Sequence, residues 1–369
     1  KERAETGRIY IMNIDHCNTH SSFKDRVYMS NLCQEITLPT DPIQHIDGKG
    51  EIALCILSAI NVGKLNYLED LDSLCDLAVR ALEEIIEHQK YPVKAAEEST
   101  KARRSLGIGY IGLAHYLAKQ KVSYEDKAAW KEVDELTEAF QYYLLKASNN
   151  IAKEKGACEY FNRTKYSDGI LPIDTYKKEV DEIVNRKLSM KWEQLRKDIK
   201  EFGLRHSTLS AQMPSESSSV VSNATNGIEP PRDYLSVKKS KKGTLKQIVP
   251  DYQRLKNFYT LLWDMKGNTG YINIVAVMQK YFDQAISGNW SYNPEHFEEG
   301  QVPISVMAQD LLTTYKLGWK TSYYQNTYDS KKDEDEPSHP LGWKDKVEET
   351  EPATLQAPED DEACESCTI

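Results

Sequence analysis

No uninterrupted run of about 18 apolar residues occurs in this chain of 369 residues, so the sequence predicts no membrane-spanning helix. The first residues, Lys1 to Glu5, lack the regions of a secretory signal peptide and contain no initiator methionine. We therefore expect the sequence to begin inside a larger unit. Only seven cysteines are present, which without a secretory signal favours a reducing compartment.

An excess of charge of one sign is also absent from most of the chain. Residues 329–369 hold 14 acidic and 4 basic side chains, whereas the first 328 residues hold 43 of each. The balanced part has no overall field that would attract nucleic acid. We predict a folded part over residues 1–328 and a disordered acidic tail over residues 329–369, which contains four prolines and few apolar residues.

Apolar patterns predict strands that alternate with helices in the folded part. Strands are expected at 8–14, 31–38, 51–62 and 321–327, and one more ends at Gln212. Helices are expected at 68–89, 101–121, 131–155, 247–265, 271–287 and 304–315, and residues 15–22 are expected to form a polar loop. The alternation predicts an α/β domain with a mainly parallel sheet or barrel. We see no internal repeat.

A thiol lies between a carboxamide and a carboxylate in the segment from Ser30 to Ile36. On extended backbone, Asn31, Cys33 and Glu35 would point to one face, because alternate residues of a strand share a face. That face would combine a hydrogen-bonding amide, an oxidisable sulfur and a candidate general base. The alternative is a core cysteine beside a solvated glutamate.

Gly107, Gly109 and Gly112 match the spacing of a dinucleotide-binding loop. That loop needs a strand directly before it, whereas residues 94–105 are charged and predicted to be helical. We interpret these glycines instead as positions that allow helices to pack closely.

Three side chains that can bind zinc lie in one short segment, at His16, Cys17 and His20. A structural zinc site needs four ligands, and no second Cys/His pair lies at a suitable distance. We therefore expect no metal site in this chain.

Small hydroxyl residues follow the strand that ends at Gln212. Residues 213–219 are expected to turn into a helix, where free N–H groups and serine hydroxyls would bind a phosphate group. An ordinary serine-rich helix N-cap explains the same pattern, and the segment alone does not decide between them.

Two pairs of oxidisable side chains stand near the end of the chain. Tyr323 and Tyr324 are adjacent in a predicted strand, where they serve either as packing residues or as a redox pair. Cys364 and Cys367 form a Cys-x-x-Cys on the acidic tail. A dithiol on a flexible tether suits the transfer of reducing equivalents to a buried disulfide, and a metal clip is the alternative.

Taken together, these segments resemble the catalytic large subunit of class I ribonucleotide reductase, in its enterobacterial and phage versions. The resemblance rests on segments that occur in the family's order. They are GRIYIMNIDHCNTH, SNLCQEI, EIALCILSAIN, RSLGIGYIGLAHYLAK, GILPIDTYKK, HSTLSAQMPSESSSVVSNATNGIEPPR, TSYYQNT and the terminal CESC. The fold that the resemblance implies is the C-terminal half of the family's ten-stranded α/β barrel, followed by the disordered tail.

The resemblance implies a role for each matching residue. Cys33 matches the cysteine that becomes a thiyl radical, Glu35 the base that takes a ribose proton, and Asn31 the amide that orients the substrate. Cys55 matches one of two thiols that reduce the ribose. The remaining matches are Pro214, Ser215, Glu216, Ser217 and Ser218 as the diphosphate-binding turn, Tyr323 and Tyr324 as the radical-transfer pair, Arg8 as an arginine beside that pair, and Cys364 with Cys367 as the tail dithiol.

The resemblance also implies partners and cofactors. A small subunit that contains metal would supply the radical and bind near the helix at 304–315, and a thioredoxin or glutaredoxin would supply reducing equivalents. No cofactor is expected in this chain itself. The partner thiol of Cys55 and the allosteric ATP and deoxynucleotide sites belong to the family's N-terminal half, so we expect a complementary N-terminal-half polypeptide and no activity of the isolated chain.

Nucleotide reduction in the cytoplasm, or in the host cytoplasm for a phage protein, is therefore the expected function. No membrane and no nucleic acid is expected as a partner. Two alternatives stay open. The chain would be a non-catalytic assembly protein that binds the small subunit, or a thiol–disulfide oxidoreductase that works through Cys364 and Cys367.

Overall fold

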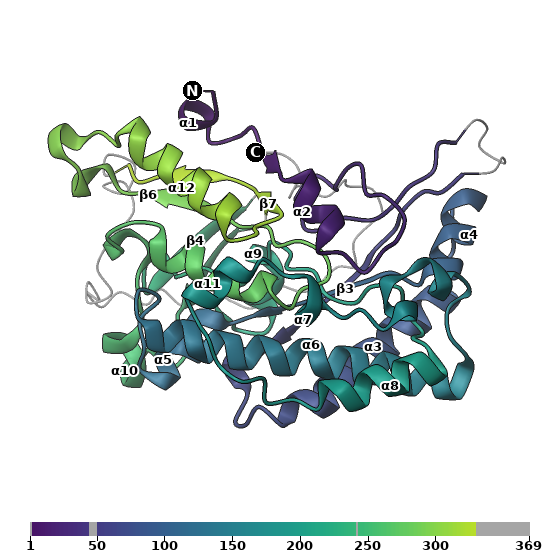
Figure 1. Cartoon of the computed structure of the whole chain (residues 1–369). Coiled ribbons are helices and arrows are strands. Elements are labelled where there is room, and N and C mark those ends of the chain that lie inside the picture. Colours follow the sequence, from purple (N-terminus) through teal and green to yellow (C-terminus); the bar gives the residue numbers. More distant parts are fainter. Residues whose placement is uncertain (1, 44–49, 241–242, 330–369) are drawn as a thin grey trace.

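The computed structural model describes residues 2–43, 50–240 and 243–329, in which helices and short strands alternate (Figure 1). The helices are α1 Glu2–Thr6, α2 Ile14–Thr19, α3 Asp70–His88, α4 Lys94–Arg103, α5 Leu113–Gln120, α6 Lys127–Lys155, α7 Pro172–Thr175, α8 Trp192–Phe202, α9 Glu216–Val221, α10 Tyr252–Leu255, α11 Thr269–Gln279 and α12 Ile304–Lys316. The strands are β1 Ile11–Met12, β2 Ile56–Asn61, β3 Leu106–Ile111, β4 Leu235–Ser240, β5 Gly243–Ile248, β6 Trp290–Tyr292, β7 Thr321–Ser322 and β8 Gln325–Thr327. No helix of these described ranges combines the length and the apolar character that crossing a bilayer requires.

A row of parallel segments runs through the centre of the molecule. Strands β2 and β3 pair in parallel over their whole length, from Ile56 opposite Leu106 to Asn61 opposite Ile111. Residues 208–212 continue the row beside β3 through a parallel bridge between Ile108 and Ser210, and residues 284–287 follow through a bridge between Gln212 and Ile286. The last two segments hydrogen-bond like strands but are too irregular to form regular ladders.

Helices cover one side of this row, and α3 packs along α6 there (Figure 1). Helix α6 is 29 residues long and buries a stripe from Ala129 to Ala152. Aromatic rings join the layers, because Phe140 of α6 lies 5.3 Å from the ring centroid of Tyr110 in β3 and 5.8 Å from that of Phe282. The core therefore sits between the helical layer and the parallel row.

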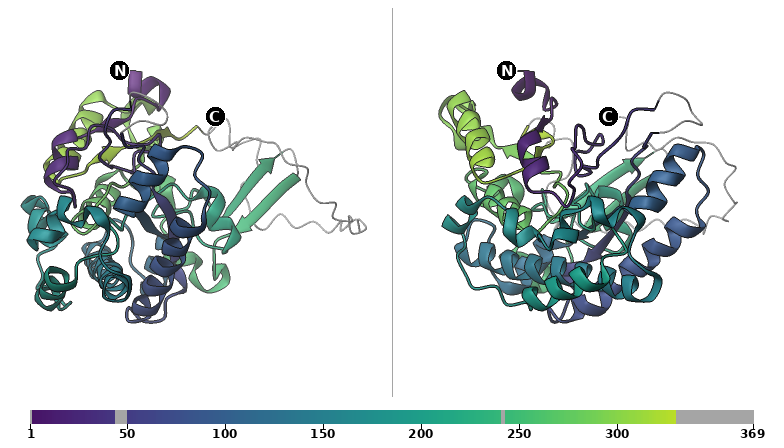
Figure 2. Two further views of the ribbon diagram at one scale, coloured as in Figure 1. Left: turned by 90° about the vertical axis from the view of Figure 1, so that its right-hand side faces the viewer. Right: turned by 45° about the vertical axis from the view of Figure 1, so that its right-hand side comes forward.

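The two ends of the described chain meet on the other side of the row. Strand β1 pairs antiparallel with β7, with Ile11 opposite Ser322, and β6 pairs in parallel with β8, with Trp290 opposite Gln325. A third pair, the antiparallel hairpin β4–β5, extends away from the body (Figure 2, left). Sequence periodicity did not predict this hairpin.

The α/β prediction is met in part. Helices α3, α6 and α12 and the parallel strand β2 lie where the apolar patterns predict them. The strands of the described residues, however, form four separate two-stranded sheets and no closed barrel. Strand β2 is also not buried on both faces, because Leu57 is 44% exposed.

Several predicted elements are wrong in detail. The helix expected at 101–121 is interrupted by strand β3, so the three glycines lie in or directly after a strand and serve strand packing instead of helix packing. A Cβ atom at Gly109 would lie 2.7 Å from the carbonyl oxygen of Ala211, which is why this position has no side chain. The expected helix at 247–265 is replaced by the end of β5, α10 and short 3-10 turns. The segment 15–22 was expected to be a loop, but its first five residues belong to helix α2.

A buried lysine holds the irregular end of the predicted helix at 271–287, which stops at Gln279. The Lys320 ammonium donates to the carbonyl oxygens of Asp283 and Gln284 at 2.8 Å each and to that of Phe282 at 3.4 Å. The side chain is fully buried, and burial lowers the pKa of Lys320 to about 7. Lys320 thus satisfies carbonyls outside the regular hydrogen-bond ladders, and two of them, those of Phe282 and Gln284, also accept from the Gln279 side chain at 3.2 Å and 2.9 Å.

We predict that Lys320→Met lowers the free energy of unfolding by about 2 kcal/mol, because it removes the donor to the buried Asp283 carbonyl, while Gln279 still donates to the Phe282 and Gln284 carbonyls. Lys316→Met is the matched control, since Lys316 is exposed and water screens its ion pair with Glu182, so its loss should change the free energy of unfolding little. Urea denaturation of both variants measures the difference. Equal stabilities would show that Lys320 does not hold this segment.

Candidate active site

The segment that carries Cys33 is a tight turn and not the extended strand that the alternation predicts. The Gln34 amide donates to the carbonyl of Asn31 at 3.2 Å, and the Ile36 amide donates to the Asn31 side-chain oxygen at 3.1 Å. Gln34 has a φ of +67°, a left-handed conformation that is unfavourable for a residue with a side chain. The turn nevertheless brings Asn31 to Glu35, although by a different geometry from the predicted one.

The Gln34 side chain stabilises this turn. Its carboxamide is buried, and the orientation that satisfies its hydrogen bonds has the nitrogen donating to the carbonyls of Ser322 at 3.1 Å and Ile11 at 3.3 Å. These carbonyls belong to paired positions of β1 and β7. The strained residue is thus fixed to the sheet where the chain ends meet.

The Cys33 thiol faces a cluster of three tyrosines. The Tyr323 hydroxyl donates to the sulfur of Cys33 at 3.4 Å. The ring centroids of Tyr323 and Tyr324 are 4.1 Å apart, and the ring of Tyr10 lies 4.6 Å from Tyr323 and 5.3 Å from Tyr324. Burial and the hydrogen bond to Cys33 raise the pKa of Tyr323, which keeps this phenol protonated. Sequence analysis paired the adjacent tyrosines but missed Tyr10, since nothing local marks it.

The Glu35 carboxyl lies behind Cys33 and is almost fully buried. Burial raises its pKa, while hydrogen bonds from Asn31 and Ser287 oppose the rise. The Ser287 hydroxyl lies 3.2 Å from one carboxyl oxygen of Glu35 and also contacts the carbonyl oxygen of Cys33. A buried carboxylate with few donors is a stronger proton acceptor than a solvated one, which suits a general base.

Cys55 lies just before strand β2, next to Gly107 of β3. A Cβ atom at Gly107 would lie 2.8 Å from the Cys55 sulfur, so the glycine leaves room for the thiol. Burial raises the pKa of Cys55 to about 12, and the Gln284 amide, 3.6 Å from the sulfur, opposes the rise. The Gln284 side chain also accepts from the Thr37 amide at 3.2 Å and donates to the Leu106 carbonyl at 2.9 Å.

Residues 283–290 therefore connect all parts of the site. Besides Gln284 and Ser287, the amide of Ala285 donates to the Glu35 carbonyl, and the Gly288 carbonyl accepts from the Tyr323 amide at 2.8 Å. The Asn289 side-chain oxygen accepts from the Tyr324 amide at 3.0 Å. The sequence analysis could not predict these contacts, because the apolar pattern of residues 271–287 predicts a continuous helix and not an irregular segment.

Two arginines fix the loops that precede Cys33 and Cys55. Arg103 lies 3.0 Å from the Asp25 carboxylate and 2.8 Å from that of Glu51, and Arg163 lies 2.8 Å and 3.1 Å from the same two groups. Asp25 and Glu51 stand before the two cysteines in the chain. The shared ion pairs thus tie both loops to one anchor.

Two arginines, Arg3 and Arg8, lie in the segment that precedes Tyr10, and the sequence analysis named only Arg8. Arg8 is exposed, whereas Arg3 donates to the Tyr323 carbonyl at 2.7 Å and to the Ile9 carbonyl at 2.8 Å. The Arg3 guanidinium also lies 4.9 Å from the Trp290 ring centroid. The role of Arg8 remains a prediction.

The predicted phosphate-binding turn follows directly on the segment that pairs with 284–287. Ser215 occupies the N-cap position of α9 and is buried, with its hydroxyl bonded to the Met213 carbonyl at 3.2 Å. The other four positions are exposed: Pro214, Glu216, Ser217 and Ser218. The turn thus has an open surface at the end of the parallel row. Cys364 and Cys367 lie outside the described residues.

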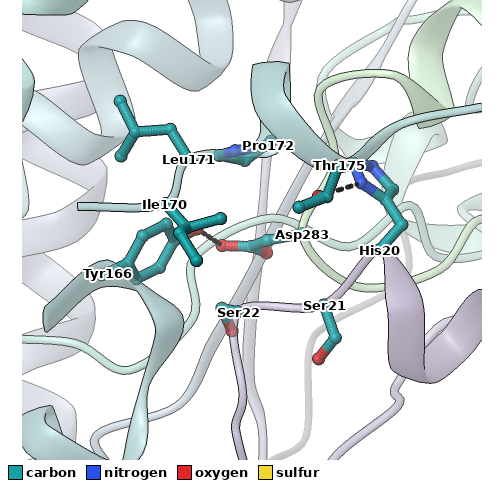
Figure 3. Close-up of a pocket in the computed structure, with 9 residues that line it drawn as sticks. All are labelled: His20, Ser21, Ser22, Tyr166, Ile170, Leu171, Pro172, Thr175 and Asp283. Carbon is teal, nitrogen blue, oxygen red and sulfur yellow. Dashed lines mark hydrogen bonds between the residues drawn. The ribbon is translucent and has the colours of Figure 1, made fainter. Parts of the chain in front are cut away.

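The side chains weighed as zinc ligands make other contacts. His20 lines a small pocket, where Nδ1 lies 2.8 Å from the Thr175 hydroxyl and Nε2 lies 2.6 Å from the Gln279 carbonyl (Figure 3). Because both ring nitrogens are engaged, His20 has no free lone pair for a metal. The described ranges contain no group of three or more potential metal-binding side chains.

We predict that alkylation of Cys55 by iodoacetamide rises about tenfold per pH unit from pH 7 to 10 without a plateau, because only the thiolate reacts and its pKa is about 12. In denaturant the rate should level off near pH 9. Peptide mapping by mass spectrometry follows Cys55 separately. Gln284→Leu should slow the folded-state reaction further, whereas Gln194→Leu, at an exposed position of α8, should not. A plateau below pH 10 in the native chain would contradict the assigned environment.

Comparison of the sequence with known proteins identifies the family to which the chain belongs. The family described as ribonucleotide reductase, barrel domain, matches residues 1–325. Subunit alpha of ribonucleoside-diphosphate reductase from Haemophilus influenzae is 59% identical over 337 residues, which are 90% of this chain and 45% of that protein. Subunit alpha of reductase 1 from Escherichia coli is 56% identical over 337 residues, 90% of this chain and 44% of that protein.

The corresponding subunit of Enterobacteria phage T4 is 44% identical over 335 residues, 89% of this chain and 44% of that protein. The chain thus spans about half the length of the curated relatives it matches. Because the family match covers nearly all of the described residues, the chain belongs to the ribonucleotide reductase barrel-domain family.

Proposed function

We propose that this chain is the catalytic-half polypeptide of a ribonucleoside-diphosphate reductase large subunit. The observation that carries the proposal is the hydrogen bond of 3.4 Å from the Tyr323 hydroxyl to the Cys33 sulfur, with the ring of Tyr324 in contact with that of Tyr323 at a centroid distance of 4.1 Å and a tilt of 53°. A hydrogen atom can pass from a thiol to a phenoxyl radical only over such a short contact. Packing alone explains tyrosine rings in contact but not a hydroxyl directed at a thiol beside a buried carboxylate.

The proposed chemistry begins with radical transfer. The small subunit would supply the oxidising equivalent that converts Tyr323 to its phenoxyl radical through Tyr324, and the S–H hydrogen of Cys33 would then pass to the Tyr323 oxygen, which restores the phenol and leaves a thiyl radical. The thiyl takes a hydrogen atom from the ribose, so that the S–H bond re-forms and a carbon radical remains. Glu35 accepts the proton of a neighbouring ribose hydroxyl, and Asn31 orients that part of the substrate.

Reduction of the ribose requires two electrons and two protons from thiols. Cys55 and a second thiol deliver them, the hydroxyl leaves as water, and the two sulfurs end as a disulfide. The raised pKa of Cys55 suits this step, because the sulfur arrives with its proton. The tail dithiol of Cys364 and Cys367 would then reduce the disulfide and be reduced in turn by a thioredoxin or glutaredoxin.

The serine-rich turn would hold the substrate diphosphate at a distance from the reacting carbon. The solvent-exposed positions of Ser217 and Ser218 at the start of α9 support this assignment, and the Ser218 hydroxyl bonds there to the Ser215 carbonyl at 3.4 Å. The turn follows residue 212, whose carbonyl accepts from the Ser287 amide at 3.0 Å, so it is linked through one residue to Glu35. Binding energy from the phosphates can thereby position the ribose.

A complementary N-terminal half should complete the site. Within the described ranges β2 pairs only with β3, so its other edge is open. Large apolar side chains are exposed around Cys33 and along β2: Tyr28 at 63%, Met29 at 58%, Leu32 at 59% and Leu57 at 44%. An open strand edge and clustered apolar residues favour a partner chain. The row of parallel segments fits half of a barrel wall, and the N-terminal half would supply the rest, the second thiol and the allosteric nucleotide sites.

The small subunit should bind at α12. Ile304 at 78%, Leu312 at 64% and Tyr315 at 45% exposure give this helix an uncovered apolar face. The proposal places the radical-generating partner on the side where the two ends of the described chain meet (Figure 1).

Reconstitution tests the proposal. We predict that this chain, mixed with an N-terminal-half polypeptide and a small subunit of the family, converts a ribonucleoside diphosphate to its deoxy form, while the chain with the small subunit alone does not. Product chromatography measures turnover. Full activity without the N-terminal half would contradict the split arrangement.

Cys33→Ser separates catalysis from the alternative of a non-catalytic assembly protein. We predict that the variant forms the same complex, as judged by sedimentation, but loses all turnover, because an alcohol does not form the required radical. Cys158→Ser, a buried cysteine outside the site, is the control and should retain turnover. Unchanged turnover of Cys33→Ser would favour the scaffold function, and disulfide reduction by the isolated chain that depends only on Cys364 and Cys367 would favour the thiol–disulfide oxidoreductase.

A further inference from the structure

We propose that Ser287 is a positioning residue whose hydroxyl links the protonation state of Glu35 to the backbone carbonyl of Cys33. The inference deepens the proposed function and rests on it for the roles of Glu35 and Cys33. Its own basis is geometric: one hydroxyl oxygen lies within hydrogen-bond distance of a Glu35 carboxyl oxygen, at 3.2 Å, and of the Cys33 carbonyl oxygen.

A serine hydroxyl has only one proton to donate, but both neighbours are acceptors when Glu35 is ionised. The hydroxyl can donate to only one of them at a time. The charged Glu35 carboxylate attracts the proton more strongly than the neutral Cys33 carbonyl does, because charge-assisted hydrogen bonds are stronger. In the structure the hydroxyl lies 2.5 Å from the Cys33 carbonyl oxygen and 3.2 Å from Glu35, which is the geometry of donation to the carbonyl. Ionisation of Glu35 would draw the hydroxyl proton, and with it the serine oxygen, away from the Cys33 carbonyl and towards the carboxylate.

Protonation of Glu35 reverses the arrangement. The carboxylic acid has a proton of its own and can donate it to the Ser287 oxygen, which frees the serine proton for the Cys33 carbonyl. A chain of two hydrogen bonds then runs from Glu35 through Ser287 to Cys33. When Glu35 takes a proton from the substrate, the backbone that carries the reacting sulfur gains a hydrogen bond in the same step.

The surroundings leave Ser287 as the adjustable part. Its amide donates to the Gln212 carbonyl at 3.0 Å, so its backbone is fixed in the parallel row. The neighbouring Ala285 amide donates to the Glu35 carbonyl at 3.0 Å, which fixes the backbone of the glutamate as well. Only the hydroxyl proton is free to rotate between the two acceptors.

The ionisable side chains on the adjoining elements are Cys33, Cys55 and Tyr323, and of these Cys55 interacts electrostatically with the Glu35 carboxyl. Cys33 lies on the same loop, Cys55 lies before β2 and Tyr323 follows β7. Asp283 lies on the segment of Ser287, but its carboxylate accepts from Ser210 and from the Tyr166 hydroxyl at 2.8 Å (Figure 3). Lys320 donates to the carbonyls of that segment. Thiols and phenols are neutral near pH 7, so the serine hydroxyl is the group that responds to Glu35.

Two carbon-13 measurements on this chain test the link. In the chain labelled at the glutamate carboxyl carbon, with Glu35→Gln for assignment, Ser287→Ala should raise the pKa of Glu35 by about one unit, since an ionised acceptor loses a donor. Ser287→Thr keeps a hydroxyl and should restore the value. Ser105→Ala, at a buried serine bonded only weakly to Ser207, is the control and should leave it unchanged.

The second measurement follows the Cys33 carbonyl in a chain labelled at the cysteine carbonyl carbon, assigned with Cys33→Ser. Its chemical shift should titrate with the pKa of Glu35 in the parent chain and in Ser287→Thr, and should stop doing so in Ser287→Ala. A serine with a merely structural role would leave this titration in place. An unchanged Glu35 pKa in Ser287→Ala, or a Cys33 signal that still follows Glu35 there, would overturn the inference.

The reconstituted complex separates this inference from the proposed function. If both hold, the acid limb of the turnover profile shifts to higher pH in Ser287→Ala by the same amount as the measured pKa. If the carbon-13 results appear but the complex reduces no nucleotide, the proton link stands and the proposed function fails.

Discussion

The hydrogen bonds of residues 283–290 are the constraint on which the rest of the site depends. This segment has no regular ladder, yet almost every residue in it bonds to a different functional element. Gln284 bonds to the Thr37 amide, Ser287 to Glu35, and Gly288 to the Tyr323 amide. Lys320 in turn satisfies the carbonyls at the start of the segment. Hydrogen bonds between side chains and the backbone therefore fix the positions of the site residues, although most of these residues lie on loops.

Burial sets the chemistry of the groups that this segment holds. Glu35, Cys55 and Tyr323 all have pKa values raised by burial, so each keeps its proton more firmly than in water. The effect suits the proposed roles in different ways, because a base must attract a proton while a thiol and a phenol would carry theirs to the reaction as hydrogen atoms. One dry environment thus serves three roles, and the few hydrogen bonds from Asn31, Ser287 and Gln284 adjust each group separately.

The sequence predicted the long amphipathic helices and the chemically distinctive residues, because both leave local signals. Helix α3 repeats its apolar residues at helical spacing, and Cys33, Glu35 and the tyrosine pair stand out by type. The predictions failed where distant contacts override local preference. Leu106–Ile111 looks like part of a helix, but its glycines fit between β2 and residues 211–213, and Asn31–Gln34 looks extended, but Gln34 bonds to β1 and β7. Tyr10 and Ser287 were missed because only the folded chain brings them to the cysteine.

The tyrosine cluster stays assembled only as long as the two ends of the described chain stay paired. Tyr10 comes from the beginning of the described chain and Tyr323 from its end, and the strands that join them, β1 and β7, are two residues each. So short a pairing opens locally at a much lower free energy than the core around α6. Local opening of the β1–β7 pairing would separate the rings of Tyr10 and Tyr323 and expose the Cys33 sulfur to water, while the rest of the described chain stays folded. Under the proposed mechanism, the lifetime of the radical would therefore depend on how often the pairing of β1 with β7 opens, and a partner bound over this pairing would keep water from the sulfur.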